Sequence, residues 1–472
     1  MKLFLRTGTL IKVIAIFVLI ALLGLTPIPH SVSQQFQRAD FALSTNNAQA
    51  AAQYYAQLAE HMHWWPELWE QAGHYAFQGA DPENAVNYFH QASIGGVLSS
   101  EGQIALGDSH HQLGNSDAAI QAWLVSGPHP GALRRLADSY IAAGDYDAAI
   151  AALKTLLADS PTPALYSELG FLLAAHNPET APPYLLSAAE LDVENASDSN
   201  ALRLVIQRAL PQNLPAYTLL VSGQHLASRG SWDLAAHAFA RAAELRPDYV
   251  EAWAYLGESL QHLTSVDPDT ALDSLTQALT IDPSSLVANT MMALYWQRHG
   301  DYEGAQIYIQ NALTSDQQTP ILYIQFGELL ALQGDLSAAQ SYYQAAVEIN
   351  PGDGAYHQAF AEFCIRYYID IRTAALPAAR QAVLLSPHDA AALDVLGQVL
   401  FRLADPINAE RLFQRSVGED PTYAPAFLHL GILYIEQSLA LLAYDNLELA
   451  VLLAPGSQTA AHAQRLLNDL AP

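Results

Sequence analysis

A period of about 34 residues runs through most of this 472-residue chain and limits the folds open to it. A typical period has a small residue, a second small residue twelve positions later and a bulky residue four positions after that, as in Gly73, Ala85 and Phe89. The first small residues are Gly73, Gly107, Ala137, Gly170, Gly223, Gly257, Ala293, Gly327, Ala361, Gly397 and Gly431. Self-similarity of this length is typical of stacked helical hairpins, which cannot bury their apolar faces singly.

Each period also carries signals for where its helices begin and end. Gly-Asp pairs at 144–145, 300–301 and 334–335 predict turns, because glycine supplies the left-handed residue that ends one helix and aspartate caps the next. Prolines stop the second helix of many periods, at Pro161, Pro247, Pro283, Pro351, Pro387, Pro421 and Pro455. Where the two helices cross, the small residue lets their axes approach and the bulky residue fills the adjoining space.

This pattern resembles the tetratricopeptide repeat, a helix–turn–helix unit of 34 residues. The match is nearly complete in one period, at Trp253, Leu256, Gly257, Leu260, Ala271, Leu275, Ala278 and Pro283. The resemblance implies an all-α fold, a right-handed α-solenoid of about eleven such repeats over about residues 66–455. We expect a half-unit before them, containing Ala51 and Tyr55, and one hydrophobic helix at the N-terminus.

Departures from the period predict the domain boundaries. The step from Gly170 to Gly223 is 53 residues long and contains an acidic stretch at 192–200 and a short helical piece near 201–210. We therefore expect a signal segment, an N-terminal array, an irregular hinge with a short helix, a C-terminal array and a capping helix, at 1–33, 34–191, 192–215, 216–455 and 456–472. Residues 361–380 lack the Gly-Asp turn, which predicts a distorted repeat.

The N-terminal segment has the composition of a membrane-directing sequence. Lys2, Arg6 and Lys12 precede or border an apolar run from Val13 to Leu25. The segment is predicted to be either an uncleaved signal anchor or a signal peptide cleaved after Ser33. By the positive-inside rule, the repeats then lie outside the cytoplasm, either anchored to the membrane or secreted. The scarcity of lysine and the lack of a cysteine pair favour a bacterial source.

Composition argues against several classes of function. The formal net charge of −27 disfavours nucleic acid and anionic bilayers as partners of the repeats, so membrane contact is expected through the N-terminal segment only. The single cysteine, Cys364, excludes an intramolecular disulfide and a cysteine-based metal site. His61 and His63 are two residues apart on a predicted helix. Their side chains therefore point in different directions and cannot bind the same metal ion. We find no phosphate loop, nucleophile elbow or metal quartet, and so expect no enzyme, cofactor or metal site.

In the family, the first helices of the repeats line a concave face. In the longer array this face is predicted to be an apolar groove with polar and charged residues along it, suited to an extended peptide or an amphipathic helix. Because the chain is acidic, a basic partner segment is favoured, and the glutamates and arginines would set its register. The candidate groove residues are Tyr217, Leu220, Gln224, Tyr255, Glu258, Met291, Arg298, Ile324, Gln325, Glu328, Arg366 and Arg402.

The function most consistent with these features is that of a non-catalytic, membrane-associated scaffold or adaptor that binds a protein partner in the groove. Two alternatives stay open. The first is a structural scaffold whose copies associate with one another as a homo-oligomer. The second is an accessory subunit of an envelope machine for polysaccharide or protein export or assembly, which rests on resemblance alone.

Overall fold

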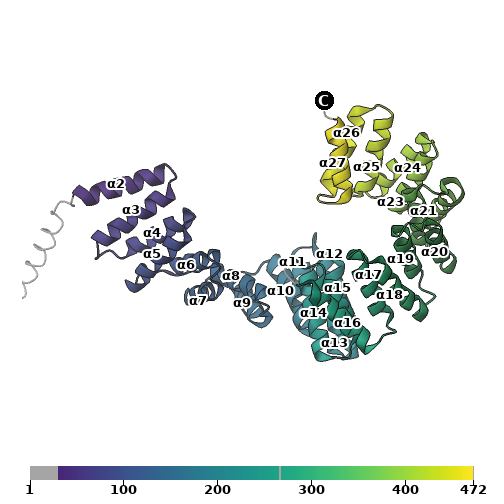
Figure 1. The fold of residues 1–472 in the computed structure, drawn as a ribbon. Helices are drawn as coiled ribbons and strands as arrows, with labels where there is room; N and C mark the ends of the chain where they lie inside the picture. The colour runs from purple at the N-terminus through teal and green to yellow at the C-terminus, as the bar shows by residue number, and fades with distance from the viewer. Residues whose placement is uncertain (1–29, 265–266, 471–472) are drawn as a thin grey trace, which may run out of the picture. The chain divides into compact units, whose positions relative to one another are not determined.

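The computed structural model describes residues 30–264 and 267–470, and most of these residues lie in helices (Figure 1). The chain forms two compact units. The boundary between them along the chain falls between Pro211 and Gln212. Consecutive helices pack against each other as hairpins within each unit, and each hairpin packs on the next. The predicted all-α solenoid of helix–turn–helix repeats is therefore confirmed.

Unit 1 contains four of the predicted repeats, α4/α5 to α10/α11. The helices are α2 (His30–Ser44), α3 (Ala48–His61), α4 (Glu67–Gln78), α5 (Pro82–Ile94), α6 (Ser100–Gln112), α7 (Ser116–Val125), α8 (Pro130–Ala142), α9 (Tyr146–Asp159), α10 (Pro163–His176), η1 (Pro178–Thr180), α11 (Pro182–Leu191) and α12 (Ala196–Ala209), followed by η2 (Leu210–Gln212).

Unit 2 contains seven repeats, α13/α14 to α25/α26, and a last helix, α27. The helices are α13 (Pro215–Ser228), α14 (Trp232–Leu245), α15 (Val250–Leu260), α16 (Pro268–Ile281), α17 (Leu286–Arg298), α18 (Tyr302–Ser315), α19 (Pro320–Leu332), α20 (Leu336–Ile349), α21 (Gly354–Tyr367), the π-helix η3 (Ile371–Ala375), α22 (Leu376–Leu385), α23 (Ala390–Arg402), α24 (Pro406–Glu419), α25 (Ala424–Glu436), α26 (Ala440–Leu453) and α27 (Gln458–Leu470).

The glycines of the repeat lie where the two helices of a hairpin come closest. A Cβ atom added at Gly397 would lie 2.6 Å from the ring of Phe413, which is buried between the helices. Gly73 and Gly223 stand in the same relation to Phe89 and Phe239. Such distances are shorter than side chains tolerate, so these crossings require glycine as long as the facing residue is aromatic.

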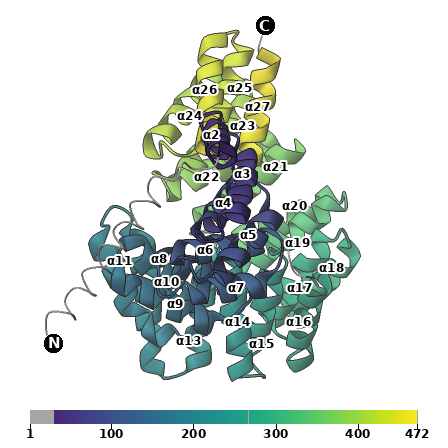
Figure 2. The ribbon, with the colours of Figure 1, turned by 90° about the vertical axis from the view of Figure 1, so that its left-hand side faces the viewer.

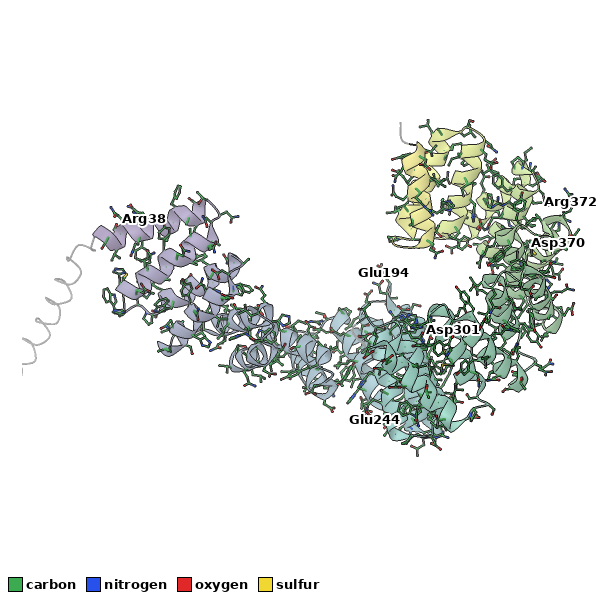
Figure 3. The ribbon with its side chains drawn as sticks, in the orientation of Figure 1. Arg38, Glu194, Glu244, Asp301, Asp370 and Arg372 are labelled. Atoms are coloured by element: carbon green, nitrogen blue, oxygen red, sulfur yellow. The ribbon has the colours of Figure 1, made fainter. Side chains whose placement is uncertain are left out.

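The predicted turn chemistry is confirmed at the Gly-Asp pairs. Gly300 has a φ angle of +77°, the left-handed region that favours glycine. The carboxylate of Asp301 then accepts a hydrogen bond of 2.8 Å from the backbone N–H of Gly304, in the first turn of α18 (Figure 3). The same cap recurs at Asp145 and Asp335.

The repeat that lacks a Gly-Asp turn is distorted, as the sequence predicts. Two residues other than glycine, Tyr368 and Asp370, have left-handed φ angles of 58° and 46°. They are followed by the π-helix η3, and Asp370 and Arg372 are both exposed at this bulge (Figure 3). The two extra residues of this period are thus accommodated between α21 and α22.

Two elements are larger than the sequence analysis predicts. The half-unit expected before residue 66 is a complete helix pair, because α2 packs against α3. The short helical piece expected near 201–210 is the 14-residue helix α12, which packs on α11 and α10 and ends unit 1. Helix α12 lacks the small-residue spacing that reveals the repeats, whereas α2 has it, because Ala39 lies 34 residues before Gly73 and 12 before Ala51.

The membrane-directing segment predicted at 1–33 lies outside the described residues up to residue 29. Within residues 30–264 and 267–470, no helix combines the length and the apolar composition that a membrane crossing requires.

Candidate functional site

Four of the twelve predicted groove residues line one hollow in unit 2. The hollow measures about 330 Å³ and lies among α13, α14, α15 and α17. Its lining residues are Gln224, Ala227, Ser228, Trp232, Phe239, Tyr255, Glu258, Ser259 and Met291. Because α13, α15 and α17 are the first helices of successive repeats, the hollow opens on the surface that these helices form, which we call the first-helix face. A volume of this size is at the lower end of the range for ligand pockets.

Aromatic side chains make the hollow apolar and hold its shape. The ring of Tyr255 stacks on Phe239 at a centroid distance of 5.4 Å, and Phe239 is buried. Trp232 stacks on His262 at 3.7 Å. Stacked rings of this kind contribute more than their buried area alone, so the walls are preorganised for an apolar side chain.

The polar edge of the hollow is an ion pair within the chain. Arg298 at the end of α17 donates two hydrogen bonds, of 2.6 and 2.8 Å, to the carboxylate of Glu258 on α15. His262 lies 3.2 Å from the same carboxylate. Burial alone raises the pKa of Glu258, but the hydrogen bonds and charges of Arg298 and His262 outweigh it, so the pKa lies below its ordinary value of 4.5.

We expect the contribution of Glu258 to stability to depend on pH. Because the folded pKa is depressed, the stabilisation is fully present above the ordinary value of 4.5 and is lost as the pH falls through the folded pKa. Since Arg298 is partly exposed, Glu258→Gln should lower the free energy of unfolding at pH 7 by only about 1 kcal/mol. Urea unfolding of both proteins between pH 3 and 7 measures this difference.

A matched control is Glu328→Gln, because Glu328 faces Arg366 at 3.6 Å in an exposed pair. This change should alter the free energy of unfolding by less than about 0.5 kcal/mol. A Glu258→Gln difference that stayed constant down to pH 3 would contradict the expectation.

The charged side chains that were expected to set the register of a partner interact with residues of the chain itself. Arg298 binds Glu258 and Arg366 faces Glu328, in each case from the last turn of one first helix to the preceding first helix. The guanidinium of Arg402 lies over the ring of Tyr368 at 5.5 Å. These side chains tie neighbouring repeats together.

The remaining predicted groove residues are placed outside the hollow. Leu220 is buried in α13, and Tyr217 is half-buried one turn before it. Ile324 packs against the core around Phe326, and the Oε1 atom of its neighbour Gln325 is buried and accepts no hydrogen bond from any described residue. Of the predicted set, the structure therefore joins Gln224, Tyr255, Glu258 and Met291 in one cavity.

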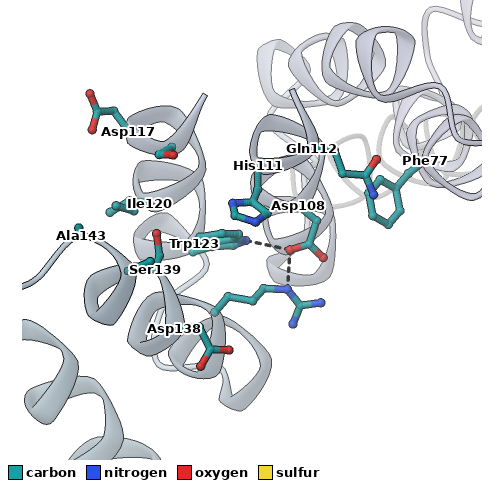
Figure 4. Close-up of a pocket in the computed structure, with 13 residues that line it drawn as sticks. Phe77, Asp108, His111, Gln112, Asp117, Ile120, Trp123, Asp138, Ser139 and Ala143 are labelled. Atoms are coloured by element: carbon teal, nitrogen blue, oxygen red, sulfur yellow. Dashed lines mark hydrogen bonds and ion pairs between the residues drawn. The ribbon is translucent and has the colours of Figure 1, made fainter. Parts of the chain in front are cut away.

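A second hollow, in unit 1, was not predicted from the sequence (Figure 4). It measures about 690 Å³ and is lined mostly by α6, α7 and α8. The carboxylate of Asp108 accepts hydrogen bonds from the indole of Trp123 (3.1 Å) and from the guanidinium of Arg135. The full lining is Phe77, Asp108, His111, Gln112, Ser116, Asp117, Ile120, Trp123, Arg135, Asp138, Ser139, Ala142 and Ala143.

The first helices of unit 1 are joined by further ion pairs. Arg134 on α8 contacts both Asp138 on its own helix and Glu168 on α10. Arg134 lies three residues before Ala137 and Glu168 two residues before Gly170, so they occupy neighbouring positions on successive first helices.

Cys364, the single cysteine, is buried in the core of the distorted repeat. Burial, and then the charge of Asp370, raises the pKa of its thiol to about 12. The thiolate needed for nucleophilic chemistry is therefore scarce at neutral pH.

Comparison with known proteins gives the class of repeat. Family models described as tetratricopeptide repeat match residues 71–131, 220–285 and 290–354, and another with the same description matches 132–162. The chain is 27% identical over 274 residues to protein CTR9 homolog of Arabidopsis thaliana. The matched region covers 54% of this chain and 24% of that protein. The chain thus spans about a quarter of the length of this curated relative.

Solved structures with a similar fold include two at 15% identity. The crystal structure of yeast Tom70 superposes with a TM-score of 0.46, and the match covers 93% of this chain and 95% of the Tom70 chain. A chain of the APC/C hetero-tetramer Cut9–Hcn1 superposes with a TM-score of 0.43, and the match covers 96% of this chain and 98% of that chain.

The fold and the hairpin packing define a helical-repeat protein, and such folds are typical of protein–protein interaction scaffolds. The repeats at 71–162, 220–285 and 290–354 match models of the tetratricopeptide repeat, as the resemblance in the sequence indicated.

Proposed function

We propose that this chain is a non-catalytic interaction scaffold and that a segment of its protein partner lies along the first-helix face of unit 2. A large apolar side chain of that segment occupies the hollow around Tyr255 and Met291. The observation that carries the proposal is the hollow itself, with its aromatic walls and an opening on the face that successive repeats share.

The pairing of charges within unit 2 indicates where the affinity comes from. Because Glu258 is already bound by Arg298, it offers little to a basic side chain of the partner. Burial of apolar surface in the hollow is then the main favourable contribution, at about 25 cal/mol per Å². Gln224 lines the hollow and supplies a polar group that orients the bound segment.

In this proposal residues 1–33 anchor the protein in the membrane, and the repeats lie outside the cytoplasm. One packing contact supports an anchor over a cleaved signal peptide. Val32 is buried against Leu58 and Leu68 in unit 1, so cleavage after Ser33 would remove a core residue and the first turn of α2.

Site-specific photo-crosslinking tests the groove. A photoreactive residue placed at Gln224, at the hollow, in the full-length protein in its native membranes should crosslink to one partner protein. Met291→Glu should reduce that product at least tenfold, because it places a charge in the apolar hollow. Mass spectrometry of the crosslinked peptides identifies the partner segment.

The control places the same photoreactive residue at Ile307, an exposed position on the second helix α18, where no product is expected. Equal products from both positions, or products only between copies of the chain, would contradict groove binding. The second outcome would support a self-associating scaffold.

A further inference from the structure

Helix α26 of unit 2 exposes large apolar side chains as well as burying apolar side chains against its neighbours. Ala443, Leu447 and Ala450 are buried, whereas Leu441 and Leu452 are 83% and 73% exposed. At about 100° per residue, the step of eleven positions from Leu441 to Leu452 amounts to about three turns, so both lie on one line along the helix. We call the exposed set Leu441, Leu442, Tyr444, Leu449 and Leu452 the α26 patch.

A patch of this kind needs an explanation. A helix that is apolar all round is normally buried, and contiguous exposed apolar surface marks sites of interaction. Other second helices of unit 2 expose single residues of this type, such as Leu384 on α22 and Ile407 on α24. The α26 patch instead extends along most of the helix, over about 17 Å.

The last helix, α27, borders the patch and makes it a groove. Helices α25, α26 and α27 lie side by side (Figures 1 and 2). A hollow of about 670 Å³ lies between α26 and α27, lined by Tyr444, Leu449 and Leu452 on one side and by Gln464, Leu467 and Asn468 on the other. This hollow is formed by a second helix and the last helix, and so is separate from the first-helix face of the proposed groove.

The groove is not shaped for another repeat helix. The eighth residue of the first helices α23 and α25 is Gly397 and Gly431, which allow the second helix to approach closely. The eighth residue of α27 is Arg465, whose long side chain prevents the same close approach. The occupant therefore packs less closely on α27 and makes its main contacts with the α26 patch.

The charges of the groove favour a basic occupant. Asp445 and Glu448 line the hollow between the leucines, and residues 440–470 contain a further acid, Asp469, against one arginine, Arg465. A second copy of this chain is a poor fit, because a two-fold contact would bring the acids of the same patch together, in a chain that carries a net charge of −27.

We propose that the α26 patch is a second docking surface, which binds an amphipathic helix of a partner protein. The helix places apolar side chains at three- and four-residue spacing against Leu441, Leu449 and Leu452. Its lysines or arginines lie beside Asp445 and Glu448. The first-helix face and the α26 patch thus let one chain hold two partner segments.

The test uses two labelled synthetic helical peptides and the purified full-length protein. Both peptides have leucines at the same spacing, and the other positions are lysine in one and glutamate in the other. Fluorescence anisotropy should show binding of the lysine peptide, weaker at high salt, and no binding of the glutamate peptide. Leu441→Gln combined with Leu452→Gln should weaken binding at least tenfold, and Asp445→Asn with Glu448→Gln should remove most of the salt dependence.

The matched control is Leu384→Gln combined with Ile407→Gln. Leu384 is 72% exposed, close to the 73% of Leu452, and lies on another second helix, so this variant should bind the lysine peptide like the wild type. Equal weakening by both double variants, or equal binding of both peptides, would overturn the proposal. So would a dimer in light scattering that only the α26 variant converts to monomer, because the occupant would then be a second copy. Met291→Glu should leave peptide binding unchanged, which separates this test from that of the first-helix face.

Discussion

Replacement of Gly397 by leucine is expected to lower the free energy of unfolding of unit 2 by about 3 kcal/mol. Even a Cβ atom at this position would lie 2.6 Å from the ring of Phe413, and that ring is buried between α23 and α24. A leucine side chain must therefore displace either the ring or one of the helices, and the loss of close packing extends to α25. Urea unfolding followed by circular dichroism measures the change.

Gly418 provides the control, because it lies in α24 and an added Cβ would meet no atom within 4 Å. Gly418→Leu should therefore be neutral or should stabilise the protein by up to about 1 kcal/mol through higher helix propensity. If Gly397→Leu proved as stable as Gly418→Leu, the helices would tolerate a wider crossing and the role assigned to the glycine would be wrong.

Replacement of His429 by leucine is the second change with a large expected effect. It should lower the free energy of unfolding of unit 2 by about 3 kcal/mol. Asp394 on α23 is 1% exposed, and Nδ1 of His429 on α25 lies 2.8 and 3.0 Å from its two carboxylate oxygens. Without the imidazole, the buried carboxylate keeps the hydrogen bond of 3.0 Å from Gln398. Because one amide does not replace the lost partner, the unpaired carboxylate destabilises unit 2.

Two further variants test that explanation. The double change Asp394→Leu with His429→Leu should recover most of the loss, since removing both partners of a buried pair leaves no unpaired charge. His388→Leu should change the free energy of unfolding by less than about 0.5 kcal/mol, because His388 contacts Glu419 from an exposed position. A double variant as unstable as His429→Leu alone would show that the loss comes from packing.

The interactions between neighbouring repeats could not be predicted from the sequence. Glu258 and Arg298 are 40 residues apart, and their pairing depends on how far one hairpin is rotated on the next. That rotation is set by the packing of many side chains at once. The hollow lined by Asp108, Trp123 and Arg135 in unit 1 arises from the same stacking, and therefore became visible only in the structure.

The α26 patch shows the same limit within a single helix. The repeat period predicts that Ala443 and Leu447, twelve and sixteen residues after Gly431, face the core, but it does not indicate whether the other leucines of ALLAYDNLELAVLL are covered. Contacts with α25 and α27 bury Leu447 and leave Leu441 and Leu452 exposed.

What the sequence determined by itself is the repeat: its period, its capped turns, its stop signals and the pairing of Gly397 with Phe413 sixteen residues later. These features depend on contacts within one hairpin, where fixed spacing along a helix decides which side chains meet. Tertiary structure alone decided which charges pair between repeats, which of the predicted groove residues share a hollow, and which leucines of α26 stay exposed. Each of these depends on the orientation of one hairpin relative to the next, which no local spacing specifies.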